Sequence, residues 1–293
     1  MNHFPTKILL ATDGSEDAAQ AREAAVDLAR KGSSELHLVH VWHDVPSPYA
    51  HAFVKRELKR QGQEILDEQV TKIKEAGGTV TKAHLRRGRT SDEVIRLSEE
   101  LGAGLLVVGS RGRGRVRRIL MGSHSEDIVH HAHLPVLVLR CVEDAWPPVR
   151  VVIGDDFSEE AKEAGELAAS IARLFEADTL LVHVYPYLLH ESSDPKAQES
   201  VRQSEKVLEE RANRLEGILG YKPRVEMLAG NPAEAILEAT RVAGPTLVAV
   251  GSRGLGSMGR MKLGSVSTKV VRAAPGSALV CCPHVERDKS QAY

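Results

Sequence analysis

The sequence predicts an α/β protein made of two tandem doubly wound domains, each with a five-stranded parallel sheet covered by helices on both faces. Three observations predict this class. Short apolar runs alternate with longer amphipathic segments along the 293 residues, which is the pattern of strands and crossover helices. The same order of segments occurs twice. A glycine-rich motif follows the fourth strand of each repeat, and right-handed crossovers give a doubly wound sheet.

In the first repeat, buried strands are expected at residues 7–12, 35–42, 79–85, 105–108 and 134–139. Helices are expected at residues 16–31, 53–76 and 123–131, with a short one that begins at Thr90. Ser15 is expected to cap the first helix and Thr90 the short one, because Ser and Thr hydroxyls accept hydrogen bonds from first-turn amides.

In the second repeat, strands are expected at residues 150–153, 179–185, 224–228, 247–250 and 278–282. Helices are expected at residues 159–175 and 196–219, with two more that begin after Asn231 and at Gly264-Ser265. The stiff segment Ala145-Trp146-Pro147-Pro148 separates the repeats. We therefore expect domains at residues 1–143 and 149–285, from duplication of a domain-sized unit.

Composition excludes several classes of function. Hydrophobic residues make up 42% of the chain and charged residues 27%, and the net charge is −1. No overall field therefore attracts nucleic acid or a membrane surface. Three cysteines without a CxxC pair provide no disulfide framework or zinc spacing, and no apolar run reaches membrane-spanning length. We expect a cytoplasmic protein that binds neither membranes nor nucleic acids.

The glycine-rich motif is typical of an anion-binding site. Its two copies are Gly109-Ser110-Arg111-Gly112-Arg113-Gly114, running on to Gly122-Ser123, and Gly251-Ser252-Arg253-Gly254-Leu255-Gly256, running on to Gly264-Ser265. Glycines let backbone amides approach an oxyanion, and a helix that begins at the serine offers unpaired donors. One copy alone could equally be a flexible turn, but two with identical spacing are hard to explain so. The motif is neither a Walker A loop nor the Rossmann fingerprint, because no Gly-Lys-Ser/Thr follows and it comes after the fourth strand.

The spacing Gly, two residues, Gly, nine residues, Gly-Ser after a buried strand resembles the ATP-binding signature of the universal stress protein family. The similarity covers nearly the whole chain, and implies a Rossmann-like, adenine nucleotide alpha hydrolase-like fold that binds ATP. The residues that the resemblance implies as nucleotide ligands in the first half are Ala11, Asp13, Val41, Gly109, Ser110, Arg111, Gly112, Arg113, Gly114, Gly122 and Ser123. Those in the second half are Gly154, Asp156, Val184, Gly251, Ser252, Arg253, Gly254, Gly256, Gly264, Ser265 and Val266.

Asp13 and Asp156 follow the first strand of each repeat. On the residues alone, a turn residue or helix cap is the favoured interpretation, because aspartate is common in both. The resemblance instead implies contact with the ribose and, through water or a divalent ion such as Mg²⁺ or Mn²⁺, with the phosphates. Gly14 follows Asp13 as the family pattern requires, whereas the bulky Phe157 follows Asp156.

Other candidate residues keep two interpretations. Val41 and Val184 end the second strands and are either core residues or, by the resemblance, backbone readers of adenine. The basic run Arg111, Arg113, Arg115, Arg117 and Arg118 either clamps phosphates or is solvated. His130, His131 and His133 favour the C-terminus of a helix over a metal site. His40 and His183 lie inside strands and are expected in the core. No catalytic set can be assembled, because Ser123 and Ser265 are better explained as phosphate-binding caps.

The leading hypothesis is a regulatory protein with two ATP sites per chain and little or no turnover, whose partners sense nucleotide occupancy. The alternatives are a slow ATPase or adenylate-handling hydrolase on the same fold, and an assembly module that has lost nucleotide. The apolar strands at residues 134–139 and 277–281 are expected to be the last in their sheets. Because exposed apolar edges tend to pair, we expect the halves to associate through them as family homodimers do. The whole chain could dimerise further.

Overall fold

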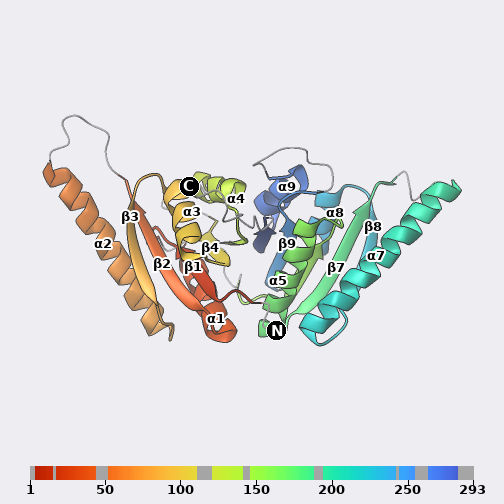
Figure 1. Cartoon of the computed structure of the whole chain (residues 1–293), viewed down its shortest axis with the longest axis horizontal. Helices are drawn as coiled ribbons and strands as arrows, with labels where there is room; N and C mark the ends of the chain where they lie inside the picture. The colour runs from red at the N-terminus through yellow and green to blue at the C-terminus, as the bar shows by residue number, and fades with distance from the viewer. Residues whose placement is uncertain are drawn as a thin grey trace, which may run out of the picture.

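A computed structural model of the chain describes residues 4–15, 18–43, 52–110, 121–140, 146–187, 194–241, 244–254 and 263–282. Strands and helices alternate in both halves, as predicted (Figure 1). The first half has the strands β1 (Lys7–Ala11), β2 (Glu35–Trp42), β3 (Lys82–Arg87), β4 (Leu105–Gly109) and β5 (Val136–Leu139). Its helices are α1 (Ala19–Gly32), α2 (Ala52–Glu75), α3 (Thr90–Leu101) and α4 (Ser123–His131).

The second half repeats this order with small changes in length. Its strands are β6 (Arg150–Gly154), β7 (Asp178–Tyr185), β8 (Arg224–Ala229), β9 (Thr246–Gly251) and β10 (Ser277–Cys281). Its helices are α5 (Glu159–Phe175), α7 (Pro195–Leu219), α8 (Pro232–Ala239) and α9 (Ser265–Ala273). The bounds predicted for β2, α4 and α5 are confirmed. β3 lies two or three residues later than predicted. Thr81 N donates to Leu36 O of β2 just before the strand begins.

The described strands form one continuous sheet in the order β3-β2-β1-β4-β5-β10-β9-β6-β7-β8. Within each half, neighbouring strands run parallel, whereas β5 and β10 are antiparallel. Val138 lies opposite Ala278 and Val136 opposite Val280. The prediction that the two last strands meet is therefore confirmed. Their pairing joins the halves about a pseudo-two-fold axis. α2 and α7 lie at opposite ends of the molecule (Figure 1).

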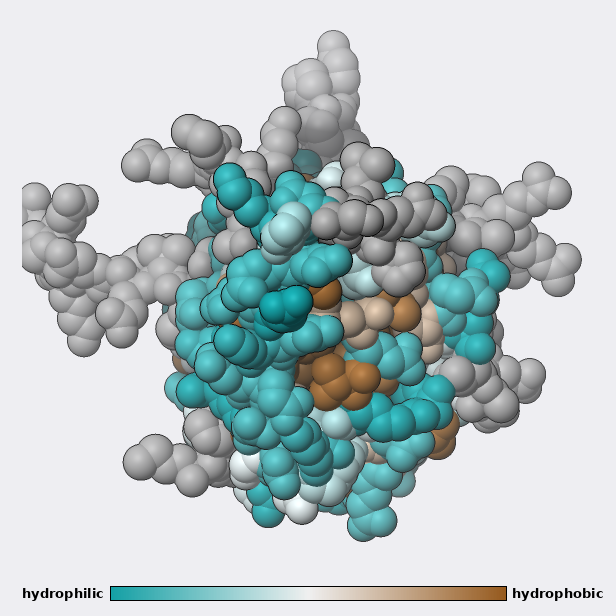
Figure 2. Space-filling view, turned by 90° about the vertical axis from the view of Figure 1, so that its right-hand side faces the viewer, coloured by the Kyte–Doolittle hydropathy of each residue, from teal (hydrophilic) through white to brown (hydrophobic). Residues whose placement is uncertain are grey.

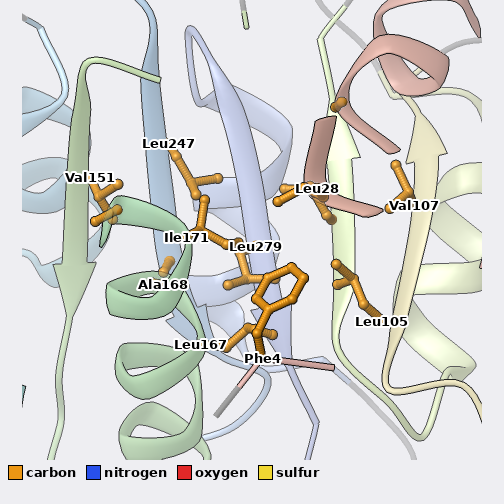
Figure 3. Close-up of a cluster of buried hydrophobic side chains, with 14 of the residues drawn as sticks. Phe4, Leu28, Leu105, Val107, Val151, Leu167, Ala168, Ile171, Leu247 and Leu279 are labelled. Carbon is orange, nitrogen blue, oxygen red and sulfur yellow. The ribbon is translucent and has the colours of Figure 1, made fainter. Parts of the chain in front are cut away.

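Apolar side chains fill both faces of this sheet, because successive residues of a strand point to opposite faces. Leu105 and Val107 pack on the face covered by α1, α2, α5 and α7. Leu106 and Val108 pack on the other face, under α3, α4, α8 and α9. The first of these clusters crosses the junction between the halves. Figure 3 shows Phe4, Leu28 and Leu105 beside Leu167, Ile171 and Leu279 of the second half.

Polar contacts also hold the halves together. The buried Arg140 donates from Nη2 to the carbonyl oxygens of Val271 at 2.7 Å and Arg272 at 2.6 Å. Arg272 in turn pairs with Glu126 of α4. In the predicted boundary segment, the Trp146 indole packs edge-on against Phe175 at 4.9 Å between ring centroids. The junction is thus a packed interface and not a loose tether.

Two predicted helix caps are wrong. α1 begins at Ala19, with Ala18 at the N-cap position and no side-chain cap. The Ser15 hydroxyl donates instead to Asp13 Oδ1 at 2.6 Å. α3 begins at Thr90 itself, so Arg89 takes the N-cap position and no side chain caps the helix. The Thr90 hydroxyl, now inside the helix, bonds with His43 Nε2 at 3.1 Å.

β3 and β8 are the edges of the sheet. Both carry charged residues, such as Arg86 and Arg87 in β3 and Arg224 and Glu226 in β8. Charge on an edge strand discourages pairing with another sheet. Figure 2 faces the end of the molecule where β8 lies and shows a largely hydrophilic surface around a central apolar patch. Among the described residues, no helix is both long and apolar enough to cross a membrane.

Candidate functional site

A cavity of about 830 Å³ opens in the first half, at the carboxyl ends of β1 and β4. In a doubly wound sheet this is where the crossovers diverge, since the chain goes from β1 to β2 on one side and β4 lies on the other. The cavity is lined by the following residues predicted from sequence: Ala11, Asp13, Val41, Gly109, Gly122 and Ser123. The fold therefore brings together residues more than a hundred positions apart.

Asp13 is held in a tight turn. Its Oδ1 accepts hydrogen bonds from the Ser15 amide at 3.0 Å and the Ser15 hydroxyl at 2.6 Å. Gly14 has a φ of 77°, a conformation that glycine adopts without a steric penalty, and its amide donates to Thr12 Oγ1 at 3.1 Å. The turn that the residues alone suggested is therefore present, and it fixes the Asp13 carboxylate at the wall of the cavity.

The two ends of the glycine loop, Ser110 and Gly122, are hydrogen-bonded to each other. Ser110 N donates to Leu139 O, and Gly122 N returns to Ser110 O, each at 2.7 Å. The Ser125 hydroxyl donates to Gly109 O at 2.7 Å and so ties α4 to the end of β4. In the second half, Ser267 makes the same bond to Gly251 O at 2.6 Å. The sequence analysis missed these two serines, although the repeated Gly-Ser-x-Ser pattern was a usable signal.

Ser123 and Ser265 do not cap their helices, which corrects the prediction. Gly122 and Gly264 take the N-cap positions with extended backbones, and neither helix has a side-chain cap. The serines are the first helical residues, because each glycine amide turns back to Ser110 or Ser252. The amides of the first turn of α4 therefore face the cavity without a capping side chain. This arrangement suits an anion better than a capped terminus would.

Part of the predicted phosphate loop lies outside the described residues. The residues concerned in the first half are Arg111, Gly112, Arg113, Gly114, Arg115, Arg117 and Arg118, and in the second half Gly256. Of the remaining predicted ligands in this loop, Ser110 and Ser252 are buried in the loop base. Their backbone oxygens accept hydrogen bonds from Gly122 N and Gly264 N.

The opposite wall of the cavity is mainly apolar. Val41 is 8% exposed and lines the cavity beside Trp42, with Leu58 and Ile65 of α2 across from them. Two histidines that the sequence analysis did not select also line it. His43 and His124 stack with 5.8 Å between ring centroids. His124 stands in α4 where the second half has Val266 in α9, so the two sites differ in chemistry beside the helix start.

The predicted residues of the second half form the same turn and loop around Asp156. Its Oδ1 accepts from the Ser158 amide at 3.1 Å and hydroxyl at 2.6 Å. Gly264 N donates to Ser252 O at 2.7 Å. Gly154 lies under α8, where an added Cβ would come within 2.7 Å of Ile236 Cδ1. Val184 is half-buried against the core. Here the turn residue after the aspartate is Phe157, at a φ of 70°.

The histidine predictions are confirmed for position. His130 and His131 lie in the last turn of α4, within 4 Å of Glu126 and Asp127 respectively. A hydrogen bond from Ser91 lowers the pKa of Asp127. His40 and His183 are buried, and donate from Nδ1 to Thr12 O at 2.9 Å and Asp155 O at 2.7 Å. Within the described ranges, no group of three or more His, Cys, Asp or Glu side chains is placed to hold a metal ion.

Comparison with known proteins agrees with this geometry. The model of the universal stress protein family matches the chain twice, at residues 5–140 and 149–281. The chain belongs to the universal stress protein family. A tandem member from Mycobacterium bovis, universal stress protein Mb2028c, is 30% identical over 292 residues, covering 91% of this chain and 94% of that protein.

Solved universal stress proteins are similar to the chain as well. The crystal structure of one from Archaeoglobus fulgidus has a TM-score of 0.68 and 27% identity, and covers 94% of this chain and 96% of that chain. A universal stress protein crystallised in complex with cAMP matches one half of the chain only, with a TM-score of 0.39 and 24% identity. It covers 47% of this chain and 99% of that chain. The Archaeoglobus fulgidus structure and the Mycobacterium bovis protein, by contrast, are similar along nearly the whole chain.

Proposed function

We propose that this universal stress protein is a nucleotide-dependent regulatory protein that binds ATP in the cavity of its first half. The observation that carries the proposal is the position of that cavity between the Asp13 carboxylate and the uncapped start of α4. Its volume of about 830 Å³ suits a ligand of nucleotide size, because small-molecule pockets range from about 300 to 1,000 Å³.

Each part of ATP meets matching chemistry in this cavity. The two Asp13 oxygens accept hydrogen bonds, which suits the paired ribose hydroxyls. The first-turn amides of α4 and its dipole favour the phosphates. The apolar wall at Val41 and Trp42 suits the flat base, and the backbone there can read its edge. A divalent ion such as Mg²⁺ or Mn²⁺ would bridge Asp13 and the phosphates through water, because hard cations prefer oxygen ligands.

Binding would change the surface that other proteins meet. A phosphate group at the start of α4 would add negative charge beside His43 and His124. We propose that partners, including a second copy of the chain, recognise this change. We also place the protein in a reducing cytoplasm: Cys281 and Cys282 are buried free thiols, and burial raises the pKa of each.

ATP binding is tested by titration calorimetry of the full chain, after any bound nucleotide has been removed by denaturation and refolding. We expect saturable heat with ATP and with ATP plus Mg²⁺, and no heat with a nucleotide-free anion such as sulfate at the same concentration. Mass spectrometry of the material released on denaturation provides an independent check. The proposal is abandoned if ATP gives no heat and no nucleotide is released.

The second candidate function is a slow ATPase or adenylate-handling hydrolase on this fold. We expect hydrolysis far below about one ATP per second, the low end of ordinary enzyme turnover. Backbone amides stabilise bound charge, but catalysis also requires a residue that orients the attacking water. Phosphate release from purified protein measures this rate. Turnover of many ATP per second, lost in the Gly122→Glu variant, would favour the enzyme.

A further inference from the structure

The two halves have the same backbone around the turn that carries Asp13 or Asp156, so their residues can be matched one by one. Thr12 N and Asp155 N donate to Val39 O and Val182 O, at 3.0 and 2.9 Å. Two residues later, Gly14 and Phe157 have φ values of 77° and 70°. Phe157 is therefore the counterpart of Gly14. Bulky residues rarely adopt this conformation, so surrounding contacts must hold Phe157 in place.

The Phe157 ring lies over a residue whose counterpart borders the open cavity. It stacks on His183, with 4.0 Å between ring centroids and 16° between ring planes. His40, the counterpart of His183, lines the cavity in the first half. Both histidines make the same Nδ1 bond to the carbonyl before the aspartate. The aromatic ring therefore takes up space that is open to a ligand in the first half.

An ion pair between Arg211 of α7 and Asp155 holds the Phe157 turn. Arg211 of α7 donates from Nη2 to Phe157 O and Ser158 O, both at 3.2 Å, and its Nε is 3.5 Å from Asp155 Oδ2. The Phe157 amide donates to Asp155 Oδ1 at 2.7 Å. Burial raises the pKa of the Asp155 carboxyl, while the Phe157 amide and Arg211 act to lower it. These bonds fix both sides of the peptide that carries the ring.

In the first half, the two positions that form this ion pair hold uncharged residues. Asp155 has Thr12 as its counterpart. Arg211 has Gln69, since each lies three residues after a buried leucine, Leu208 or Leu66, on its helix. Gln69 Oε1 instead accepts a hydrogen bond from Arg22 Nη1 at 3.0 Å. Three positions around the turn thus differ between the halves: glycine, threonine and glutamine in one, and phenylalanine, aspartate and arginine in the other.

The glycine loop of the second half also lies against the aspartate. An added Cβ on Gly254 would come within 2.2 Å of Asp156 Oδ2. One on Gly251 would come within 2.7 Å of Ala161 N. Ser158 Oγ lies 3.4 Å from Arg253 O. The backbone at Gly254 therefore lies close to the Asp156 carboxylate.

We infer that Phe157, held in place by Arg211 and Asp155, blocks the second nucleotide site, so that the chain binds one ATP and not two. The inference rests on the proposed function. It reduces the number of ATP sites from the two expected from sequence to one. Phe157 is then the residue that makes the two halves differ in nucleotide binding. The second half then acts as a permanently closed scaffold, and only the first half changes state with nucleotide.

The test exchanges the two counterparts and counts bound ATP by titration calorimetry. We expect one ATP per chain for the wild type and two for Phe157→Gly, because glycine removes the ring and suits the φ of 70°. The matched variant Gly14→Phe should weaken the first site at least a hundredfold. In the double variant Phe157→Gly/Gly122→Glu, one site should remain, now in the second half. Circular dichroism establishes that each variant is folded.

The outcomes separate the two proposals. A wild-type stoichiometry of two overturns the inference and leaves ATP binding intact. A stoichiometry of one in Phe157→Gly also overturns it, because the ring would then not be what closes the site. If neither the wild type nor Phe157→Gly binds ATP, the proposed function itself is contradicted. If Gly14→Phe does not fold, the increase from one to two in Phe157→Gly still decides the question.

Discussion

Gly122→Glu is expected to abolish measurable ATP binding while leaving the fold intact. Gly122 is the N-cap of α4 with a φ of −66°, which any residue can adopt. A glutamate there places a carboxylate beside the first-turn amides and repels the phosphates. Losing one hydrogen bond to a charged group costs about 1.5–3 kcal/mol, a roughly tenfold to hundredfold loss of affinity. The added repulsion makes the effect larger.

The matched control is Gly264→Glu, at the same position of α9. Its φ is −63°, and an added Cβ would lie 3.3 Å from Ser252 O, so the neighbouring chain must shift only slightly. If the second site is closed, this variant should bind ATP with wild-type affinity. Equal loss in both variants would indicate a general effect of charge on the protein. Unchanged binding in Gly122→Glu would show that the start of α4 does not hold phosphate.

Val138→Lys is expected to cause the largest loss of stability. Val138 is 1% exposed, lies in β5 opposite Ala278, and belongs to the core in the middle of the continuous sheet. An unpaired buried ammonium costs more than about 4 kcal/mol, against a total stability of about 5–15 kcal/mol for a domain. Urea unfolding measures the loss. Hydrogen exchange should show that the amides of β10 lose protection first.

Val149→Lys provides the control, because Val149 is 53% exposed at the start of the second half. It adds the same charge near the junction without burying it, and should change the free energy of unfolding by less than about 0.5 kcal/mol. If Val138→Lys matches this control in stability and keeps its β10 amides protected, β5 and β10 do not meet in solution.

Strands and helices could be predicted from sequence because burial alone decides them. A run such as Leu105–Val108 is apolar at every position, which only a strand covered on both faces requires. Helix caps could not be predicted as well. Whether Gly122 or Ser123 takes the N-cap depends on where the Gly122 amide finds an acceptor, and that acceptor is Ser110 O, twelve residues earlier. Such a contact exists only once the loop has closed.

The candidate site shows the same division. The glycine spacing and Asp13 are local patterns, and they predicted one edge of the cavity. The apolar wall at Leu58 and Ile65 comes from α2, whose face toward the cavity is set by tertiary packing. The sequence shows that Phe157 replaces glycine. Its consequence depends on His183 and Arg211, which are 26 and 54 residues further along and reach the turn only in the folded chain.

The joining of the two halves in one chain, with the β5–β10 ladder between them, has an evolutionary consequence. When two identical chains pair by such edges, every substitution appears in both copies, so a residue that damages one pocket damages its mate as well. A fused gene removes this constraint, since each half then accumulates changes separately while the shared ladder keeps them together. Gly14 and Phe157 are one such difference between the halves, at equivalent positions of the two aspartate turns.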